Sequence, residues 1–301
     1  MTIQAMKAYI IIPVHNRRNI SLKCLQKLAE FQVFSMCQVI VIDDGSTDRT
    51  AEEIQKQYPQ VILLSRNGDL WWGGAIVLGM KYAMENNADY LIWLNDDCEV
   101  FPDAIEKLLA TCEENPNTIV GARSLQSREN PEPSYGGLVA EGLKIKYVYE
   151  GECDGLAGNL VCIPRSVVEK IGYLDDRKFP QYFGDVIYTN TAKRNGFRLL
   201  IEKDVNTYCQ DDNKALNWFE KKYSVSDVIA QRFSKKSSSL WSARIRYEWH
   251  FLGLYGVVRY LFWEWLFKIP FFFMMSIIDR FITIAEIKKK LQIIFSKLKG
   301  S

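Results

Sequence analysis

Two adjacent carboxylates follow a short apolar segment in the first third of the chain. Residues 90–94 are almost entirely apolar, and they lead directly into Asn95-Asp96-Asp97. Such a run has the length of a buried strand and is too short for a helix. Adjacent carboxylates at the end of a buried strand repel each other, so they must be solvated, paired or bound to a metal. A hard divalent cation that also binds substrate phosphates needs only one or two protein carboxylates. The alternative is a solvated turn before a helix that begins at Pro102 and Asp103.

Two earlier apolar segments end in polar residues in the same way. Residues 9–12 lead into Pro13-Val14-His15-Asn16-Arg17, and residues 38–42 lead into Asp43-Asp44. The carboxyl ends of parallel strands share one edge of a sheet, and open α/β sheets bind their ligands at that edge. We therefore expect the three polar segments to converge there.

The order of the segments predicts a mostly parallel, Rossmann-like sheet flanked by helices. Repeated alternation of strands and helices is typical of this α/β class. Ser21 is the expected N-cap of the first helix. Strands are expected at 9–12, 38–42, 61–64, 90–94 and 118–122, and helices at 21–31, 49–58, 73–86 and 102–114.

The charge of the chain is unevenly distributed. The net charge of +2 combines an acidic part and a basic part. Residues 1–213 contain 22 Lys and Arg against 30 Asp and Glu, a net charge of −8, and residues 214–301 contain 16 against 6, a net charge of +10. The two parts are expected to meet different partners. We predict domains at 1–215 and 216–301.

The cysteines and the N-terminus both predict a cytoplasmic protein. Seven cysteines are scattered without a C-x-x-C pair, which argues against a disulfide framework or a structural zinc site and fits a reducing compartment. The N-terminal apolar segment, Ala8 to Val14, is interrupted by Pro13 and followed by polar and basic residues, unlike a signal peptide.

Four segments in this order resemble family 2 glycosyltransferases with the GT-A fold. They are Ile11 to Arg17, Val41 to Asp48, Arg66 to Ala75 and Asn95-Asp96-Asp97. The third segment is similar to a subgroup found among bacterial polysaccharide and O-antigen enzymes, including rhamnosyltransferases. The resemblance extends through about residue 212.

The resemblance implies a nucleotide-sugar site at the sheet edge. Asp43 would accept a hydrogen bond from the imide N–H of uracil or thymine, because a carboxylate accepts but cannot donate. Asp97 would coordinate Mg²⁺ or Mn²⁺, and the ion would neutralise charge on the departing nucleoside diphosphate. Trp72 would either pack in the core or contact the sugar or nucleoside. The expected nucleotide-sugar-binding residues are Pro13, His15, Arg17, Asp43, Asp44, Asn67, Trp72, Gly73 and Asp96.

The resemblance assigns the catalytic base to Asp185. Asp185 would take a proton from an acceptor hydroxyl as that oxygen attacks the anomeric carbon, which gives inversion. The alternative is that Asp185 is only the N-cap of a helix through Arg194. The chain departs from the family in two respects. It has Ile187 where many relatives carry a second acid, and it has no histidine for the metal between Phe183 and Asn213, where Gln210, Asp211 or water would substitute.

The basic C-terminal part is expected to be a helical, aromatic appendage. Residues 251–278 are strongly apolar, but Arg259, Glu264, Lys268 and Pro270 interrupt them. The longest uncharged piece is about half of the roughly twenty residues needed to span a bilayer. Interspersed aromatic and basic side chains favour an interfacial membrane segment, to which Lys288-Lys289-Lys290, Lys297 and Lys299 would add attraction for anionic lipid. The alternatives are a helical hairpin on the catalytic domain or a homo-oligomer interface. Nucleic acid is not an expected partner.

These observations together predict a metal-dependent inverting glycosyltransferase at the inner face of the cell membrane. It would move a sugar from a UDP- or dTDP-sugar to a lipid-linked or cell-surface glycan. The alternative is a membrane-docked nucleotide-sugar-binding or scaffold protein without turnover. A nucleotidyltransferase is a third hypothesis, but its glycine-rich phosphate loop is absent after the first strand.

Overall fold

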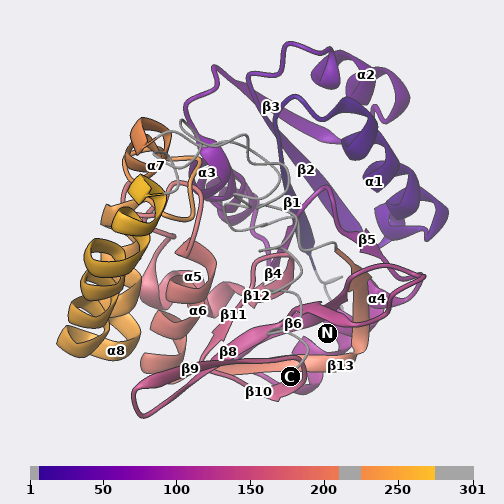
Figure 1. Cartoon of the computed structure of the whole chain (residues 1–301). Coiled ribbons are helices and arrows are strands. Elements are labelled where there is room, and N and C mark those ends of the chain that lie inside the picture. Colours follow the sequence, from indigo (N-terminus) through magenta and orange to yellow (C-terminus); the bar gives the residue numbers. More distant parts are fainter. Residues whose placement is uncertain (1–6, 210–224, 275–301) are drawn as a thin grey trace. The chain divides into compact units, whose positions relative to one another are not determined.

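The structure is a computed structural model that describes residues 7–209 and 225–274. The chain divides into two compact units, Met1–Asp211 and Asp212–Ser301 (Figure 1). The expected basic cluster at 288–299 lies outside the described residues. The expected domains, 1–215 and 216–301, stay a prediction as domains of separate function.

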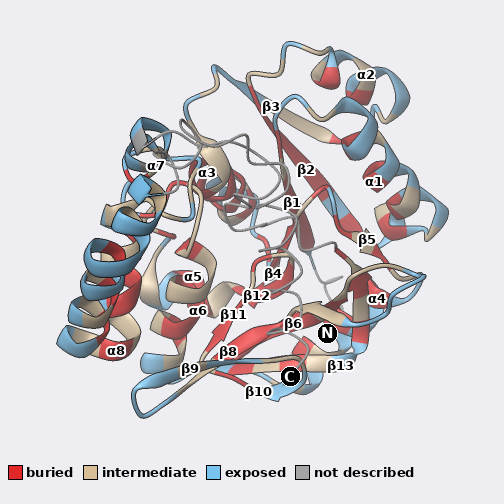
Figure 2. Cartoon of the chain, in the orientation of Figure 1, coloured by how far each residue is buried: buried red, intermediate tan, exposed pale blue. Residues whose placement is uncertain are grey.

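A parallel four-stranded segment forms the N-terminal half of the central sheet. Its neighbours are β3 (Ile62–Arg66), β2 (Cys37–Asp44), β1 (Ala8–Val14) and β4 (Tyr90–Leu94), in that order. Successive residues of β1 point to opposite faces, so Ile10 and Ile12 join one hydrophobic cluster and Ile11 joins the other. Burial on both faces explains the uninterrupted apolar runs of β1, β2 and β4, and Figure 2 shows these three strands as largely buried. The edge strand β3 is half-buried to exposed.

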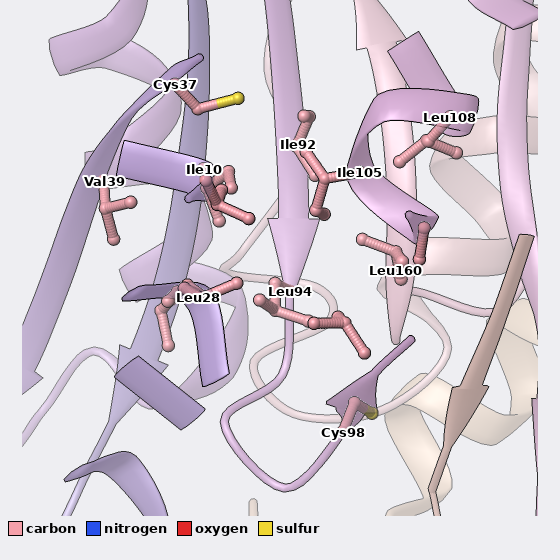
Figure 3. Packing of buried hydrophobic residues seen from close by; sticks show 14 of the residues in the cluster. Ile10, Leu28, Cys37, Val39, Ile92, Leu94, Cys98, Ile105, Leu108 and Leu160 are labelled. Carbon is pink, nitrogen blue, oxygen red and sulfur yellow. The ribbon is translucent and has the colours of Figure 1, made fainter. Parts of the chain in front are cut away.

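Helices cover both faces of this sheet. On one face lie α1 (Arg18–Glu30), α2 (Thr50–Gln57) and α4 (Ala104–Glu114). Their side chains Leu28, Ile105 and Leu108 meet Ile10, Ile92 and Leu94 of the strands (Figure 3). The other face is covered by α3 (Trp71–Glu85), α5 (Arg165–Ile171) and α6 (Gly184–Arg194). The predicted α/β architecture, a central sheet flanked by helices, is therefore confirmed.

Beyond β4 the sheet becomes mixed. β12 (Leu160–Pro164) runs antiparallel to both β4 and β6 (Thr118–Leu125), and β13 (Arg198–Tyr208) is parallel to β6. The short strands β5 (Glu99–Val100), β7 (Pro133–Tyr135) and β10 (Gly151–Glu152) extend this sheet. A second sheet contains β11 (Gly155–Leu156), β8 (Gly137–Glu141) and β9 (Lys144–Val148). The return of β12 between β4 and β6 brings residues near 158 to the carboxyl end of β4.

The expected N-cap at Ser21 is wrong. Helix α1 begins at Arg18 with Arg17 at the N-cap position, so Ser21 lies inside the first turn. Its hydroxyl contacts the backbone oxygen of Arg17 at 3.1 Å and donates to Asp96 Oδ2 at 2.7 Å. A tertiary partner, the carboxylate of Asp96, has therefore decided the role of Ser21.

The described part of the second unit is helical. It contains α7 (Val225–Gln231), α8 (Trp241–Trp263) and a π-helical turn η2 (Glu264–Lys268), and α8 is kinked at Gly253. Two buried glutamates carry cationic partners: Glu248 pairs with Arg244 and Arg259, and Glu264 pairs with Arg232 and Lys268. Among residues 7–209 and 225–274, we find no helix with the length and apolar character required to cross a membrane.

The buried carboxylate of Asp44 organises the loop before α3. Its two oxygens accept hydrogen bonds from the backbone N–H groups of Gly68 (3.0 Å), Leu70 (3.0 Å) and Trp71 (2.9 Å). The neighbouring Asp43, also buried, accepts one such bond, from Ser46 at 3.3 Å. The first aspartate of the pair therefore keeps more of its acceptor capacity, whereas the second holds the Gly68–Trp71 backbone in place.

Asp44→Asn should therefore lower the free energy of unfolding, by about 1–3 kcal/mol, because an amide with a single acceptor oxygen leaves buried N–H donors unpaired. Asp43→Asn is the matched control and should change it by less than about 1 kcal/mol. Urea unfolding of both variants measures the difference. Equal losses would show that the contacts of Asp44 have no special role in the loop.

Candidate functional site

The three polar segments meet at one edge of the sheet, as predicted. The parallel register places Val14 of β1 beside Asp43 of β2, and Ile11 beside Trp93 of β4. The loop after β1 therefore passes the end of β4. There Arg17 contacts both carboxylates: Nη1 lies 3.0 Å from Asp96 Oδ1, and Nη2 donates to Asp97 Oδ2 at 2.7 Å.

Asp96 and Asp97 have different surroundings. The Asp96 side chain is buried, and that burial raises its pKa to about 6, against the opposing effects of Arg17 and Ser21. The side chain of Asp97 is 39% exposed, and its Oδ1 accepts a weak bond from Cys98 Sγ at 3.8 Å. Asp96 thus serves as an inner anchor, and Asp97 is the carboxylate open to a ligand.

The loops after β1 and β2 are joined by His15 and Asn16. His15 Nδ1 lies 2.6 Å from the backbone oxygen of Asp44, so Nδ1 must carry the proton. Its Nε2, 3.0 Å from the Asn16 amide nitrogen, is then the acceptor of a neutral ring. Asn16 Oδ1 accepts from the backbone N–H of Thr47 at 2.7 Å. These contacts assign His15 to holding two loops together, while Pro13 lies half-buried below them.

The segment 66–75, where donor-binding residues were expected and which is called the donor loop from here on, contacts the carboxyl end of β4 and the residues before α6. Trp72 Nε1 donates to Asn95 Oδ1 at 2.8 Å, and its ring meets Trp93 edge-on at 5.7 Å between centroids. The backbone of Gly73 donates to the oxygen of Pro180 at 2.7 Å, and a Cβ there would lie 2.5 Å from the oxygen of Phe179. Gly73 is therefore required for close backbone packing. Asn67 is exposed and directly precedes the Gly68–Trp71 backbone that Asp44 holds.

Asp185 is not an N-cap. Helix α6 begins at Gly184 with Phe183 at the N-cap position, so Asp185 lies in the first turn. Its Oδ2 accepts from the backbone N–H of Gly158 at 2.7 Å. Burial raises the pKa of this carboxyl, although the Gly158 bond acts in the opposite direction. A carboxylate of this kind holds a proton more firmly than an exposed aspartate, as a general base must.

Gly158 lies between the expected base and the expected donor loop. A Cβ at Gly158 would lie 2.9 Å from Trp72 Cζ2 and 3.0 Å from Asp185 Cβ, so only glycine fits. The next residue, Asn159, accepts at its backbone oxygen from Asn95 N–H, and its side-chain oxygen accepts from Asn95 Nδ2, both at 3.0 Å. A continuous set of contacts therefore runs from Asp185 through Gly158 and Asn159 to Asn95.

Sequence reasoning did not select Ser21, Asn95, Gly158 or Asn159 as site residues. Asn95 opens the motif that supplied Asp96 and Asp97, so its position was a usable signal. Asn159 is separated from it by 64 residues and becomes a neighbour only because β12 pairs with β4.

The chemistry of the residues around Asp97 fits a divalent cation brought in with a diphosphate. Such an ion takes one or two protein carboxylates and completes its shell with phosphate oxygens and water. Asp97 supplies the exposed carboxylate, and Asp96 is already held by Arg17 and Ser21. The expected further ligands Gln210 and Asp211 lie outside the described residues.

Comparison with known proteins relates this chain to glycosyltransferases. Residues 9–146 match the family described as Glycosyl transferase family 2. A dolichol-phosphate mannosyltransferase of Pyrococcus furiosus is 26% identical over 141 residues, which cover 46% of this chain and 39% of the relative. A low-salt glycan biosynthesis hexosyltransferase of Haloferax volcanii is 22% identical over 250 residues, which cover 77% of this chain and 78% of the relative. The chain thus spans well under half of the first relative.

The fold likeness also includes a solved structure. The mannosyltransferase of Pyrobaculum calidifontis in complex with GDP-Man and Mn²⁺ superposes with a TM-score of 0.56 at 12% identity, covering 100% of this chain and 82% of that protein. At this identity the likeness concerns the fold. Together with the family model matched over residues 9–146, it shows that the chain has the fold of the GT-A glycosyltransferases.

Proposed function

We propose that this protein is a metal-dependent inverting glycosyltransferase that moves a sugar from a UDP- or dTDP-sugar to a hydroxyl of a lipid-linked or cell-surface glycan. The observation that carries the proposal is the set of contacts from Asp185 to Asn95, because it joins a proton acceptor to the carboxylate edge of the sheet. The rhamnosyltransferase-like, O-antigen type of enzyme is the subgroup we favour.

In this mechanism the Asp43 carboxylate accepts a hydrogen bond from the imide N–H of the nucleobase. Within the protein it accepts one hydrogen bond, from the Ser46 N–H, so it keeps acceptor capacity for this contact. The Trp72 ring packs edge-on against Trp93, and in this mechanism it would also contact the sugar or the nucleoside. A divalent ion, Mn²⁺ or Mg²⁺, would be held by Asp97 and would supply charge neutralisation for the diphosphate. The Mn²⁺ in the related mannosyltransferase structure supports this choice of cofactor.

Asp185 performs the proton transfer. Its Oδ2 accepts from the Gly158 N–H, and in this mechanism the carboxylate takes the proton of the acceptor hydroxyl. The deprotonating oxygen attacks the anomeric carbon as the bond to the diphosphate oxygen breaks. One displacement inverts the configuration, and a single base suffices. The alternative, a nucleotide-sugar-binding protein without turnover, has the same donor site.

Donor binding is tested by thermal unfolding of the purified protein with UDP, dTDP, GDP and CDP, each with Mn²⁺ or with EDTA. UDP or dTDP should raise the melting temperature only with metal, because a ligand that binds the native state stabilises it by about 2.7 kcal/mol at a hundredfold excess over Kd. Asp97→Ala should remove the shift, and Glu150→Ala, at an exposed carboxylate outside the proposed donor site, should keep it. A shift with GDP alone would contradict the assignment of uracil or thymine as the nucleobase. No shift with any nucleotide would contradict the donor site.

The catalytic role is tested with Asp185→Asn. The asparagine oxygen still accepts from Gly158, so the fold and the metal-dependent nucleotide shift should persist. Sugar transfer should fall by about 10²–10⁴-fold, the usual contribution of a general base. In the wild type, the transfer rate should fall as the pH drops through the raised pKa of Asp185. Equal transfer by wild type and variant would remove Asp185 from the mechanism, and no transfer by either would favour the protein without turnover.

We further propose that the second unit binds a membrane surface at the cytoplasmic face. Large apolar side chains are exposed on the described part of α8 and η2, together with the basic Arg259 and Lys268. They include Trp249, Leu254, Val258, Phe262, Trp263, Trp265, Leu266 and Phe267. Aromatic and cationic side chains in one helical segment favour the interfacial region of a bilayer.

Co-sedimentation with vesicles that contain anionic lipid measures this binding. Replacement of Trp263 and Trp265 by Ser should weaken it by about tenfold for each side chain, from the apolar surface withdrawn from water. Leu143→Ser with Tyr147→Ser, at two exposed positions of the first unit, is the matched control and should bind as the wild type does. Unchanged binding by the tryptophan variant, or concentration-dependent dimers that it abolishes, would assign these side chains to another role.

A further inference from the structure

A carboxylate and two thiols meet at the end of β4. Asp97, Cys98 and Cys209 each offer one ligand atom, and these three atoms lie within 4.8 Å of one another. In the part of the chain that the structure describes, no other group of His, Cys, Asp and Glu meets that criterion. Both thiols are buried, whereas Asp97 is exposed and provides the approach from solvent.

The strand register produces this meeting. β13 pairs with β5 in antiparallel fashion, with Thr207 opposite Val100 and Tyr208 opposite Glu99. The same register continued by one residue places Cys209 opposite Cys98. Side chains directly opposite in an antiparallel pair lie on the same face, a few ångströms apart. The backbone N–H of Cys209 also donates to the oxygen of Leu125 at 2.8 Å, which holds its position.

Neighbouring groups orient the three ligands. Arg17 occupies Oδ2 of Asp97, which turns Oδ1 toward Cys98 Sγ at 3.8 Å. Asn159 Nδ2 donates to Cys209 Sγ at 3.6 Å. Hydrogen bonds of this kind fix the ligands of metal sites and tune their affinity.

The donor set selects the class of ion. Thiol sulfur is a soft ligand that favours zinc-like cations, whereas Mg²⁺ favours oxygen. Two zinc–sulfur bonds of about 2.3 Å in tetrahedral geometry separate the sulfurs by about 3.8 Å. The observed spread, within 4.8 Å, needs a contraction of about 1 Å or less to reach that geometry.

We propose that Asp97 Oδ1, Cys98 Sγ and Cys209 Sγ form a binding site for a thiophilic divalent cation of the zinc class. Each thiol that binds releases its proton to solvent, and a fourth position stays open for water. The site shares Asp97 with the ion of the proposed transfer reaction, so the two ions compete for that carboxylate. The inference does not depend on that reaction, because it concerns metal binding by the protein alone.

The test is titration of the full-length, reduced, metal-free protein with Cd²⁺, followed by calorimetry and by the ultraviolet thiolate-to-cadmium charge-transfer band. We expect one saturable ion per chain. Cys98→Ser and Cys209→Ser should weaken the band and raise the dissociation constant by at least about tenfold. Asp97→Asn should raise the dissociation constant while the band persists at saturation, because both thiols remain.

Cys112→Ser is the matched control, since Cys112 is also buried and lies in the same hydrophobic cluster as Cys98. It should bind Cd²⁺ as the wild type does. Thermal unfolding without metal establishes that each variant is folded. If Cys209→Ser does not fold, the single variants Cys209→Ala and Asp97→Asn supply the test. The proposal is overturned if the wild type shows no saturable binding, if the band is unchanged in folded Cys98 and Cys209 variants, or if Cys112→Ser removes it. Thermal unfolding with nucleotides plays no part in these outcomes, so the cation site and the glycosyltransferase proposal can fail independently.

Discussion

The adjacency of Asp96 and Asp97 at the end of a buried strand is the constraint around which the first unit is arranged. Two carboxylates in that position are stable only if at least one is neutralised. Arg17 meets this need by contacting both, at 3.0 and 2.7 Å, and Ser21 supplies the remaining bond to Asp96. Because Arg17 is also the N-cap residue of α1, its guanidinium ties the start of that helix to the end of β4.

In the second aspartate pair, Asp43 and Asp44, the two carboxylates also have different roles. Asp44 is saturated by the backbone N–H groups of the loop that leads into α3, whereas Asp43 accepts a single bond. Each pair therefore has a structural member and a member with free capacity. The order differs, because the structural member is the second residue, Asp44, of one pair and the first residue, Asp96, of the other.

The site also depends on close backbone packing. Gly158 fits between the Trp72 ring and Asp185, and Asn159 is held by Asn95 on the neighbouring strand end. Rigid contacts of this kind hold a proton acceptor in one orientation, as a general base requires. In the second unit, the buried glutamates Glu248 and Glu264 each have two cationic partners, which explains how charge is tolerated between apolar helices.

The sequence by itself determined the α/β class, the strands from Ala8 to Leu94 and the meeting of three polar segments, because each depends on local periodicity and on a general rule about parallel sheets. It also marked Asp97 and Asp185 as candidates, through motifs whose roles await the experiments above. Only the tertiary structure decided which partner each polar side chain has. Ser21 was expected to cap its helix but bonds to Asp96, and Asp185 bonds to Gly158 and lies past the helix cap. Cys98 and Cys209 have no meaningful spacing along the chain, and they meet because β13 pairs with β5. Contacts between residues far apart in sequence depend on strand order and register, which local patterns of hydrophobicity do not encode.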